Sequence, residues 1–257
     1  MKQGLLEMHI QEVWSKHLPA RNAWQHLPGT YLSELLASSG ADVVTLDLQH
    51  GMIDLPAARD SILAIEARDA APFVRLPGID TALIGCLLDA GVAGLICPTV
   101  ERQSQAEALV AAACYPPHGN RSCGPNRALL SFGPDYVNIA QDNVVTFAMI
   151  ETLAGLEAVE EIARVNHLGG LFIGPGDLGI SMGLGPGQDR SEPEIETAIR
   201  RVSEAARENG KRLGIHANTP EYAARMAAQG FDLVTVCSDA DLLGNGAAQA
   251  IRRFGQV

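Results

Sequence analysis

The stretch that decides the fold runs over residues 148–183, AMIETLAGLEAVEEIARVNHLGGLFIGPGDLGISMG. An apolar run leads to Glu151, and a helical pattern with one apolar and one charged face follows over 152–165. A second apolar run, 170–173, leads to a Gly-Pro-Gly segment and Asp177. The stretch therefore predicts a strand, a helix and a second strand, with one carboxylate just beyond the C-terminal end of each strand.

The same alternation of strand-like and helical runs extends over the whole chain, which is typical of a parallel α/β protein. The predicted strands are, in order, 22–27, 42–47, 71–75, 94–97, 144–150, 170–173, 212–216 and 232–236. The predicted helices are 30–39, 55–68, 81–90, 103–113, 152–165, 195–209, 219–229 and 239–254. Eight such units predict one (β/α)8 TIM barrel domain over residues 1–257, close to the roughly 250 residues typical of that fold. A doubly wound open sheet is the alternative, but the first strand–helix turn lacks its glycine fingerprint.

One segment, 115–142, breaks the alternation. It is rich in proline and glycine, and we predict a long loop there. A loop of this length inside a compact domain is usually functional, so we expect it to contribute to substrate recognition.

Composition excludes several classes of partner. The formal net charge of −11 argues against nucleic acid and anionic membranes, because both reward a basic surface. Five cysteines without regular spacing fit a reducing compartment. No run approaches the roughly 18 apolar residues of a membrane helix, and the N-terminal MKQGLLEMHIQEVW lacks the apolar core of a signal peptide. We therefore expect a cytoplasmic protein that acts on small molecules.

A (β/α)8 barrel builds its active site at the C-terminal ends of the strands. The residues at or just after these ends are Asp47, Gln49, His50, Arg75, Glu151, Gly174, Gly176, Asp177, His216, Cys237, Ser238 and Asp239. Two carboxylates, Glu151 and Asp177, suit a hard divalent cation that keeps several waters. The backbone N–H groups of the Gly174–Asp177 segment could bind a carboxylate.

Three further residues complete a coherent set. A carboxylate of Asp47 bonded to the His50 imidazole would fix its tautomer and leave the other nitrogen as a base. Arg75 offers a rigid fork for a carboxylate or a developing oxyanion. Taken singly, each candidate has a structural explanation, such as a cap, a first-turn acid, a loop histidine or an ion-pair partner. Together at neighbouring strand ends, they favour metal-assisted chemistry at a carbonyl group.

Several motifs follow one another in a specific order: LDLQHG (46–51), VRLPG (74–78), LLDAGVAGLICPTVE (87–101), YPPHGNRSCG (115–124), MIETLAGLEAVEEIA (149–163), LFIGPGDLGISMG (171–183) and GFDLVTVCSDADLL (230–243). This ordered set resembles the HpcH/HpaI family of class II pyruvate aldolases over residues 30–241. The resemblance implies a (β/α)8 barrel, usually a hexamer in which the last helix, about 239–254, is exchanged between subunits.

The resemblance also implies a reaction, the reversible cleavage of a 4-hydroxy-2-oxo acid to pyruvate, or a close analogue, and an aldehyde. Glu151 and Asp177 would bind Mg²⁺, Mn²⁺ or Co²⁺. His50, oriented by Asp47, would serve acid–base chemistry, and Arg75 would stabilise the enolate oxygen.

Three more positions take their interpretation from the resemblance. Asp89 would reach the active site of a neighbouring subunit. The family often has glutamate where this chain has Gln49, and many members have glutamine where it has Met149. Both changes fall in the pocket, so they affect the expected acceptor specificity rather than the metal chemistry.

Three alternative functions fit the sequence less well. A related carbon–carbon lyase of the citrate lyase β or malyl-CoA lyase type would need a surface for the nucleotide tail, and the sequence has no basic cluster for it. A barrel that only binds a 2-oxo acid would have lost one of His50, Arg75, Glu151 or Asp177, and all four are present. A Schiff-base aldolase would need a lysine at a strand end, where this chain has none.

Overall fold

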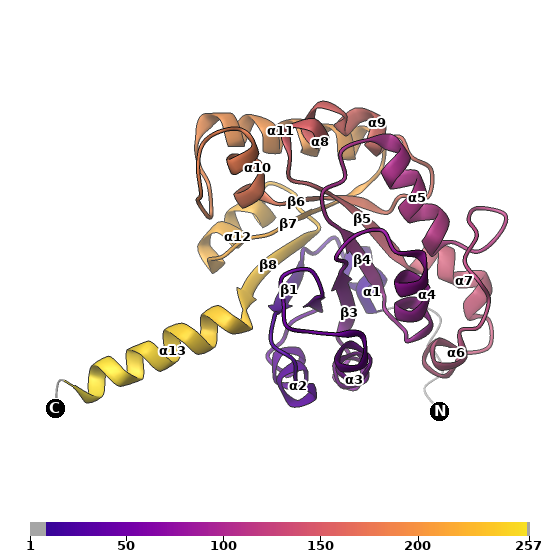
Figure 1. Ribbon diagram of the computed structural model, residues 1–257, viewed down its shortest axis with the longest axis horizontal. Coiled ribbons are helices and arrows are strands. Elements are labelled where there is room, and N and C mark those ends of the chain that lie inside the picture. The colour runs from indigo at the N-terminus through magenta and orange to yellow at the C-terminus, as the bar shows by residue number, and fades with distance from the viewer. Residues whose placement is uncertain (1–8, 256–257) are drawn as a thin grey trace.

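Eight parallel strands close into a barrel in chain order in the computed structural model, which describes residues 9–255. The strands are β1 (Ala20–Gln25), β2 (Val43–Asp47), β3 (Ala71–Arg75), β4 (Gly94–Cys97), β5 (Val145–Ile150), β6 (Gly170–Ile173), β7 (Arg212–Ile215) and β8 (Leu233–Ser238). Each strand pairs with the next, and β8 pairs with β1. Figure 1 shows the strands at the centre of the molecule with helices around them. The predicted (β/α)8 fold is confirmed.

Helices surround the barrel. They are α1 (His9–Ser15), α2 (Thr30–Ser38), α3 (Leu55–Glu66), α4 (Thr81–Asp89), α5 (Gln103–Ala113), α6 (Asn126–Phe132), α7 (Tyr136–Asn143), α8 (Leu153–Glu157), α9 (Val159–Ala163), α10 (Pro175–Ser181), α11 (Pro193–Glu208), α12 (Pro220–Ala228) and α13 (Asp239–Phe254). Local chemistry starts several of them: Asp54 caps α3, Asp80 caps α4 and Thr219 caps α12, each accepting from a backbone N–H of the first turn.

Aromatic side chains fill the inside of the barrel. Each of three phenylalanines is in register with a glycine on the next strand: Phe73 with Gly94, Phe147 with Gly170, and Phe172 with Gly214. A Cβ built on any of these glycines would lie 2.4 Å from the paired ring, so only glycine leaves room for the ring. The rings contact one another, with centroids 6.4 Å apart for Phe73 and Phe147 and 6.1 Å apart for Phe147 and Phe172. This packing fills the barrel beneath the strand ends.

The structure corrects four local predictions. The predicted loop 115–142 contains α6 and α7, because Pro125 and Gly133, which read as loop signals, instead bound a short helix. The predicted helix 152–165 is divided into α8 and α9 at Ala158, whose φ and ψ are −95° and 9°. Helix α10 lies where only a loop was expected after β6, and α1 was not predicted. Residues 1–8, on which the expected absence of a signal peptide partly depends, lie outside the described residues.

The last helix, α13, projects away from the barrel (Figure 1). Of its described residues, only Asp239 at its first position is buried. Four large apolar side chains on it are exposed: Leu242, Leu243, Ile251 and Phe254. Among the described residues, no helix is long and apolar enough to cross a membrane.

Candidate active site

Asp47 and Arg75 form a buried ion pair at the C-terminal rim of the barrel. They end β2 and β3 and are partners in the parallel register of these strands. Arg75 Nε donates to Asp47 Oδ1 at 2.9 Å, and the guanidinium also donates to Oδ2. The guanidinium lies 5.0 Å from the centre of the Trp24 ring, and Trp24 Nε1 donates to Asp47 at 3.2 Å. The pair therefore holds Arg75 in one orientation at the strand ends.

Burial alone would raise the pKa of Asp47. The hydrogen bonds and charge of Arg75, helped by the backbone N–H of His50 and by Trp24, instead lower that pKa to about 2. Asp47 is therefore a carboxylate at any working pH, and its negative charge keeps the Arg75 fork in place.

The turn after β2 is organised by the same carboxylate. The backbone N–H groups of Gln49 and His50 donate to Asp47 Oδ1 at 3.0 and 3.1 Å. Asp47 thus fixes the backbone that carries His50, whereas we expected it to bind the imidazole ring. The His50 side chain is exposed at the rim. Gly51 allows the turn to close, because a Cβ there would lie 2.2 Å from the carbonyl oxygen of Asp47.

Glu151 follows β5 and is almost fully buried, with 2% of its surface exposed. The backbone N–H of Thr99 donates to its Oε1 at 2.7 Å, while its buried Oε2 has no hydrogen-bond partner among the described residues. Burial, assisted by the nearby charge of Asp177, raises the pKa of Glu151 to about 7, although Thr99 and Arg75 oppose the rise. A buried carboxylate oxygen without a partner is costly unless something else approaches it.

The segment after β6 brings Asp177 towards Glu151. Pro175 starts α10, and Asp177 lies exposed in its first turn. A Cβ on Gly174 would lie 2.7 Å from Glu151 Oε2, so this glycine supplies space. Its N–H donates to the carbonyl of Ile150 at 3.3 Å, which corrects the expectation that Gly174 offers a free N–H. The N–H groups of Gly176 and Asp177, in the first helical turn, remain the candidates for binding an anion.

These residues fit a divalent cation. Within residues 9–255, no group of three or more His, Cys, Asp or Glu side chains is arranged to hold a metal ion. The candidate donors are two carboxylates, Glu151 and Asp177, and the buried Oε2 of Glu151 lacks a hydrogen-bond partner among the described residues. Hard cations such as Mg²⁺ accept one or two protein carboxylates and take their other ligands from water and substrate.

The sequence interpretation missed His26. The first strand was predicted to end at residue 27, which placed His26 inside it, whereas β1 ends at Gln25 and His26 belongs to the rim. Its Nε2 lies 3.5 Å from Asp47 Oδ2, and its Nδ1 lies 3.3 Å from Asp239 Oδ1. A strand boundary two residues earlier would have added His26 to the strand-end set.

His216, which follows β7, lies beside the site. Its ring meets the Trp24 ring edge-on, with centroids 4.8 Å apart, and its buried Nδ1 has no hydrogen-bond partner among the described residues. Burial, together with the positive charges of Arg75 and His26, lowers the pKa of His216 to about 4. The His216 side chain is therefore uncharged near neutral pH and lies beside the site.

This pKa predicts an acid-dependent loss of stability. As pH falls from the ordinary value of 6.5 towards 4, the unfolded chain protonates His216 and the folded chain does not, so unfolding becomes easier. His216→Gln should remove a contribution of roughly 3 kcal/mol from this loss, since the pKa of His216 is lowered from 6.5 to about 4 and one pKa unit corresponds to roughly 1.4 kcal/mol. Urea unfolding midpoints of both proteins across this pH range test the prediction, and parallel pH dependences would contradict it.

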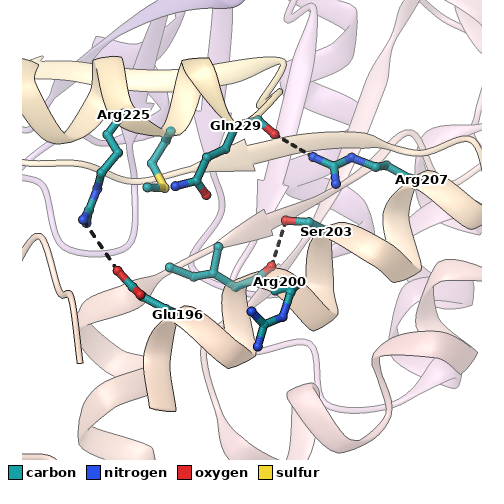
Figure 2. Close-up of a pocket in the computed structure, with 8 residues that line it drawn as sticks. Glu196, Arg200, Ser203, Arg207, Arg225 and Gln229 are labelled. Atoms are coloured by element: carbon teal, nitrogen blue, oxygen red, sulfur yellow. Dashed lines mark hydrogen bonds and ion pairs between the residues drawn. The ribbon is translucent and has the colours of Figure 1, made fainter. Parts of the chain in front are cut away.

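A separate groove lies on the outer surface between α11 and α12, where Figure 2 shows three arginines and one glutamate. Arg225 lies 3.6 Å from Glu196, and Arg207 donates to the carbonyl of Gln229 at 2.6 Å. The residues that line this groove come from the outer helices, and none is a strand-end residue. The candidate site is therefore the barrel rim.

The protein is a closed (β/α)8 barrel with an Arg–Asp pair and two carboxylates at its C-terminal rim. Barrel enzymes of this class build their active sites at that rim, from the loops that follow the strands. The model of the HpcH/HpaI aldolase/citrate lyase family matches residues 23–246. The chain belongs to this family, and the predicted resemblance is confirmed.

Individual relatives agree with this assignment. A hydroxypyruvate/pyruvate aldolase of Rhizorhabdus wittichii is 40% identical over 94% of this chain and 96% of its own. A 4-hydroxy-2-oxo-heptane-1,7-dioate aldolase of Klebsiella pneumoniae is 34% identical over 92% of this chain and 89% of its own. The crystal structure of a family protein from Burkholderia cenocepacia superposes with a TM-score of 0.85 at 30% identity, covering 95% and 98% of the two chains.

Proposed function

We propose that the protein is a divalent-metal-dependent aldolase that reversibly cleaves a 4-hydroxy-2-oxo acid to pyruvate, or a close analogue, and an aldehyde. The observation that carries the proposal is the buried, unpartnered Oε2 of Glu151 beside Asp177, on the same rim as the Arg75–Asp47 pair. The relatives named hydroxypyruvate/pyruvate aldolase and 4-hydroxy-2-oxo-heptane-1,7-dioate aldolase support a 2-oxo acid substrate.

Glu151 and Asp177 would hold the cation, for which Mg²⁺, Mn²⁺ and Co²⁺ are the candidates. When bound, a divalent cation polarises a carbonyl group and favours the enolate of the 2-oxo acid. The raised pKa of Glu151 supports this role, because a carboxylate that is unfavourable alone becomes favourable next to a cation. The N–H groups of Gly176 and Asp177 would bind the substrate carboxylate.

Arg75 supplies a fixed positive charge for the enolate oxygen. Its orientation is held by Asp47 and by the Trp24 face, so little reorganisation is needed when negative charge develops. The charge matters most in the transition state, where the C3–C4 electron pair moves towards the 2-oxo group.

Arg75→Ala should therefore lower kcat more than it changes KM, by roughly a hundredfold or more, as for loss of an oxyanion-hole donor. Steady-state kinetics of cleavage measure the split. Arg201→Ala is a suitable control, because Arg201 on α11 pairs with Glu160 on α9 at 2.8 Å, on the outer helices. An effect confined to KM would mean that Arg75 only binds substrate.

His50 is the proposed acid–base group. It would accept the proton of the 4-hydroxyl group as the C3–C4 bond breaks and the aldehyde forms, and would return a proton to C3 of the enolate to give pyruvate. Its exposed position on a turn fixed by Asp47 suits a group that must meet substrate.

A panel of substrates tests the proposed function. We expect pyruvate and an aldehyde from one or more 4-hydroxy-2-oxo acids, scored with lactate dehydrogenase and by mass spectrometry. Malyl-CoA and citramalyl-CoA form the second arm, because a CoA-thioester lyase is the alternative within the family. Cleavage of the thioesters alone would replace the proposal.

We also propose that the enzyme is a hexamer in which α13 is exchanged between subunits. The projecting helix carries four exposed apolar side chains, which a neighbouring subunit would cover. Asp89 ends α4, which runs back towards the N-terminal ends of the strands, so it lies far from the site of its own chain. Arg121 holds it at 2.8 Å, and it would reach the site of a neighbour.

Charges placed on the apolar face of α13 should break this assembly. Leu243→Glu with Ile251→Glu is expected to reduce the mass seen in light scattering from that of six 27.2 kDa chains to that of smaller species, because burying unpaired carboxylates is costly. Gln249→Glu, an exposed position on the same helix, is the matched control. An unchanged mass for the double variant would exclude α13 from the interface.

We place the enzyme in the cytoplasm. All five cysteines, Cys86, Cys97, Cys114, Cys123 and Cys237, are free. Five free thiols fit a reducing compartment. We expect the enzyme to act on small metabolites and to bind neither nucleic acid nor a membrane.

A further inference from the structure

The ring of His26 lies between two buried carboxylates. Its Nε2 is 3.5 Å from Asp47 Oδ2, and its Nδ1 is 3.3 Å from Asp239 Oδ1. The His26 side chain is 27% exposed, whereas those of Asp47 and Asp239 are 0% and 1% exposed. The imidazole therefore bridges the end of β2 and the start of α13 at the edge of the active site.

The position of His26 is fixed by its backbone. Its N–H donates to Asp239 Oδ1 at 2.8 Å, and the N–H of Leu27 donates to Oδ2 at 2.9 Å. Its carbonyl accepts from the N–H of Met52 at 2.7 Å. A Cβ on Gly51 would lie 2.9 Å from that carbonyl oxygen, so the two turns are packed as closely as a glycine allows.

Each ring nitrogen faces a carboxylate oxygen, and a nitrogen that bears a proton can donate to it. A proton on Nε2 would direct the donor at Asp47, and a proton on Nδ1 would direct it at Asp239. The ring is thus placed to hold the two carboxylates in position.

Charged and titratable side chains follow one another along this line: Asp239, His26, Asp47 and Arg75. His216, just after β7, also interacts electrostatically with the His26 ring. Among the described residues, His26 is the one side chain that forms an ion pair or a side-chain hydrogen bond with Asp239. Loss of His26 would leave Asp239 with backbone donors and Asp47 with Arg75 and Trp24.

We propose that His26 is a positioning residue of the active site. Through Nε2 it holds the Asp47 carboxylate, and through Asp47 it sets the orientation of Arg75 and of the turn that carries His50. Through Asp239 the same ring ties the site to the base of α13. This role rests on the proposed aldolase function.

Two variants test the roles of the two ring nitrogens separately. In His26→Gln the side-chain amide reaches where Nε2 stood and can donate to Asp47, whereas in His26→Asn it reaches where Nδ1 stood and can donate to Asp239. Loss of a residue that orients a catalytic group typically costs 10–100-fold, so we expect kcat of His26→Asn to fall by roughly tenfold or more with little change in KM. We expect His26→Gln to stay within roughly threefold of the wild type.

His167→Asn is the matched control. His167 lies just before β6, at the opposite end of the barrel, and its φ of 62° is a conformation that asparagine tolerates. Cleavage kinetics and melting temperatures of the four proteins are compared. Equal kcat for His26→Asn and His26→Gln, at the wild-type level or below it, would overturn the proposal.

Nitrogen NMR of the wild-type enzyme gives a readout that does not depend on activity, with the His26 signals assigned by comparison with His26→Gln. The Nε2 of His26 should carry the proton directed at Asp47, and a bare Nε2 would overturn the proposal. If the wild-type enzyme cleaved no 4-hydroxy-2-oxo acid, the proposed function would fail, while the NMR result would still decide the state of the ring.

Discussion

Glu151→Gln is expected to lose cation binding and to reduce cleavage by roughly a thousandfold or more, because a metal contributes several kcal/mol to a transition state that develops negative charge. One of two protein carboxylates would be gone, and a weakly held cation needs both. The fold should tolerate the change, since Glu151 is buried and its raised pKa already favours an uncharged group there. Asp177→Asn should show the same loss.

Calorimetric titration with Mn²⁺ and the rate of pyruvate release measure the two effects. Glu161→Gln is the matched control, because Glu161 lies exposed on α9, in the same strand–helix unit. Undiminished cleavage by Glu151→Gln, with its cation binding intact, would show that the cation is held elsewhere.

His50→Ala is expected to retain cation and pyruvate binding and to lose cleavage by roughly two to four orders of magnitude, the usual contribution of a positioned acid–base group. The proposed metal ligands, one just after β5 and one in α10, are untouched by the change. Pyruvate affinity by calorimetry and pyruvate release from a 4-hydroxy-2-oxo acid separate the two functions.

His167→Asn, at a histidine just before β6 and at the opposite end of the barrel, is the control. Cleavage by His50→Ala at the wild-type rate would assign the proton transfer to another group. His216 is then a poor candidate, because its pKa is lowered to about 4 and its Nδ1 is buried.

The barrel could be predicted because buried parallel strands read as short apolar runs between amphipathic helices. The ends of elements were harder to predict. Pro125 and Gly133 are loop signals in the sequence, yet they bound helix α6, since the same residues both end helices and form turns. The two-residue error at the end of β1 is of this kind, and it concealed His26.

The site residues could be predicted as a set, because strand ends converge on one rim of a barrel. Their contacts could not. Asp47 pairs with Arg75 because the register of β2 and β3 places them side by side, and a sequence does not state the register. The unpartnered Oε2 of Glu151 depends on the space left by Gly174, which is a packing detail of two adjacent strands.

Pyruvate release by the wild-type enzyme, measured before and after removal of divalent cations, tests the central claim most directly. The assay uses a 4-hydroxy-2-oxo acid that the enzyme cleaves, a strong chelator followed by its removal, and addition of Mg²⁺, Mn²⁺ or Co²⁺ in separate samples. We predict that cleavage disappears with the cation and returns with one or more of the three. Full cleavage after exhaustive chelation would contradict the account.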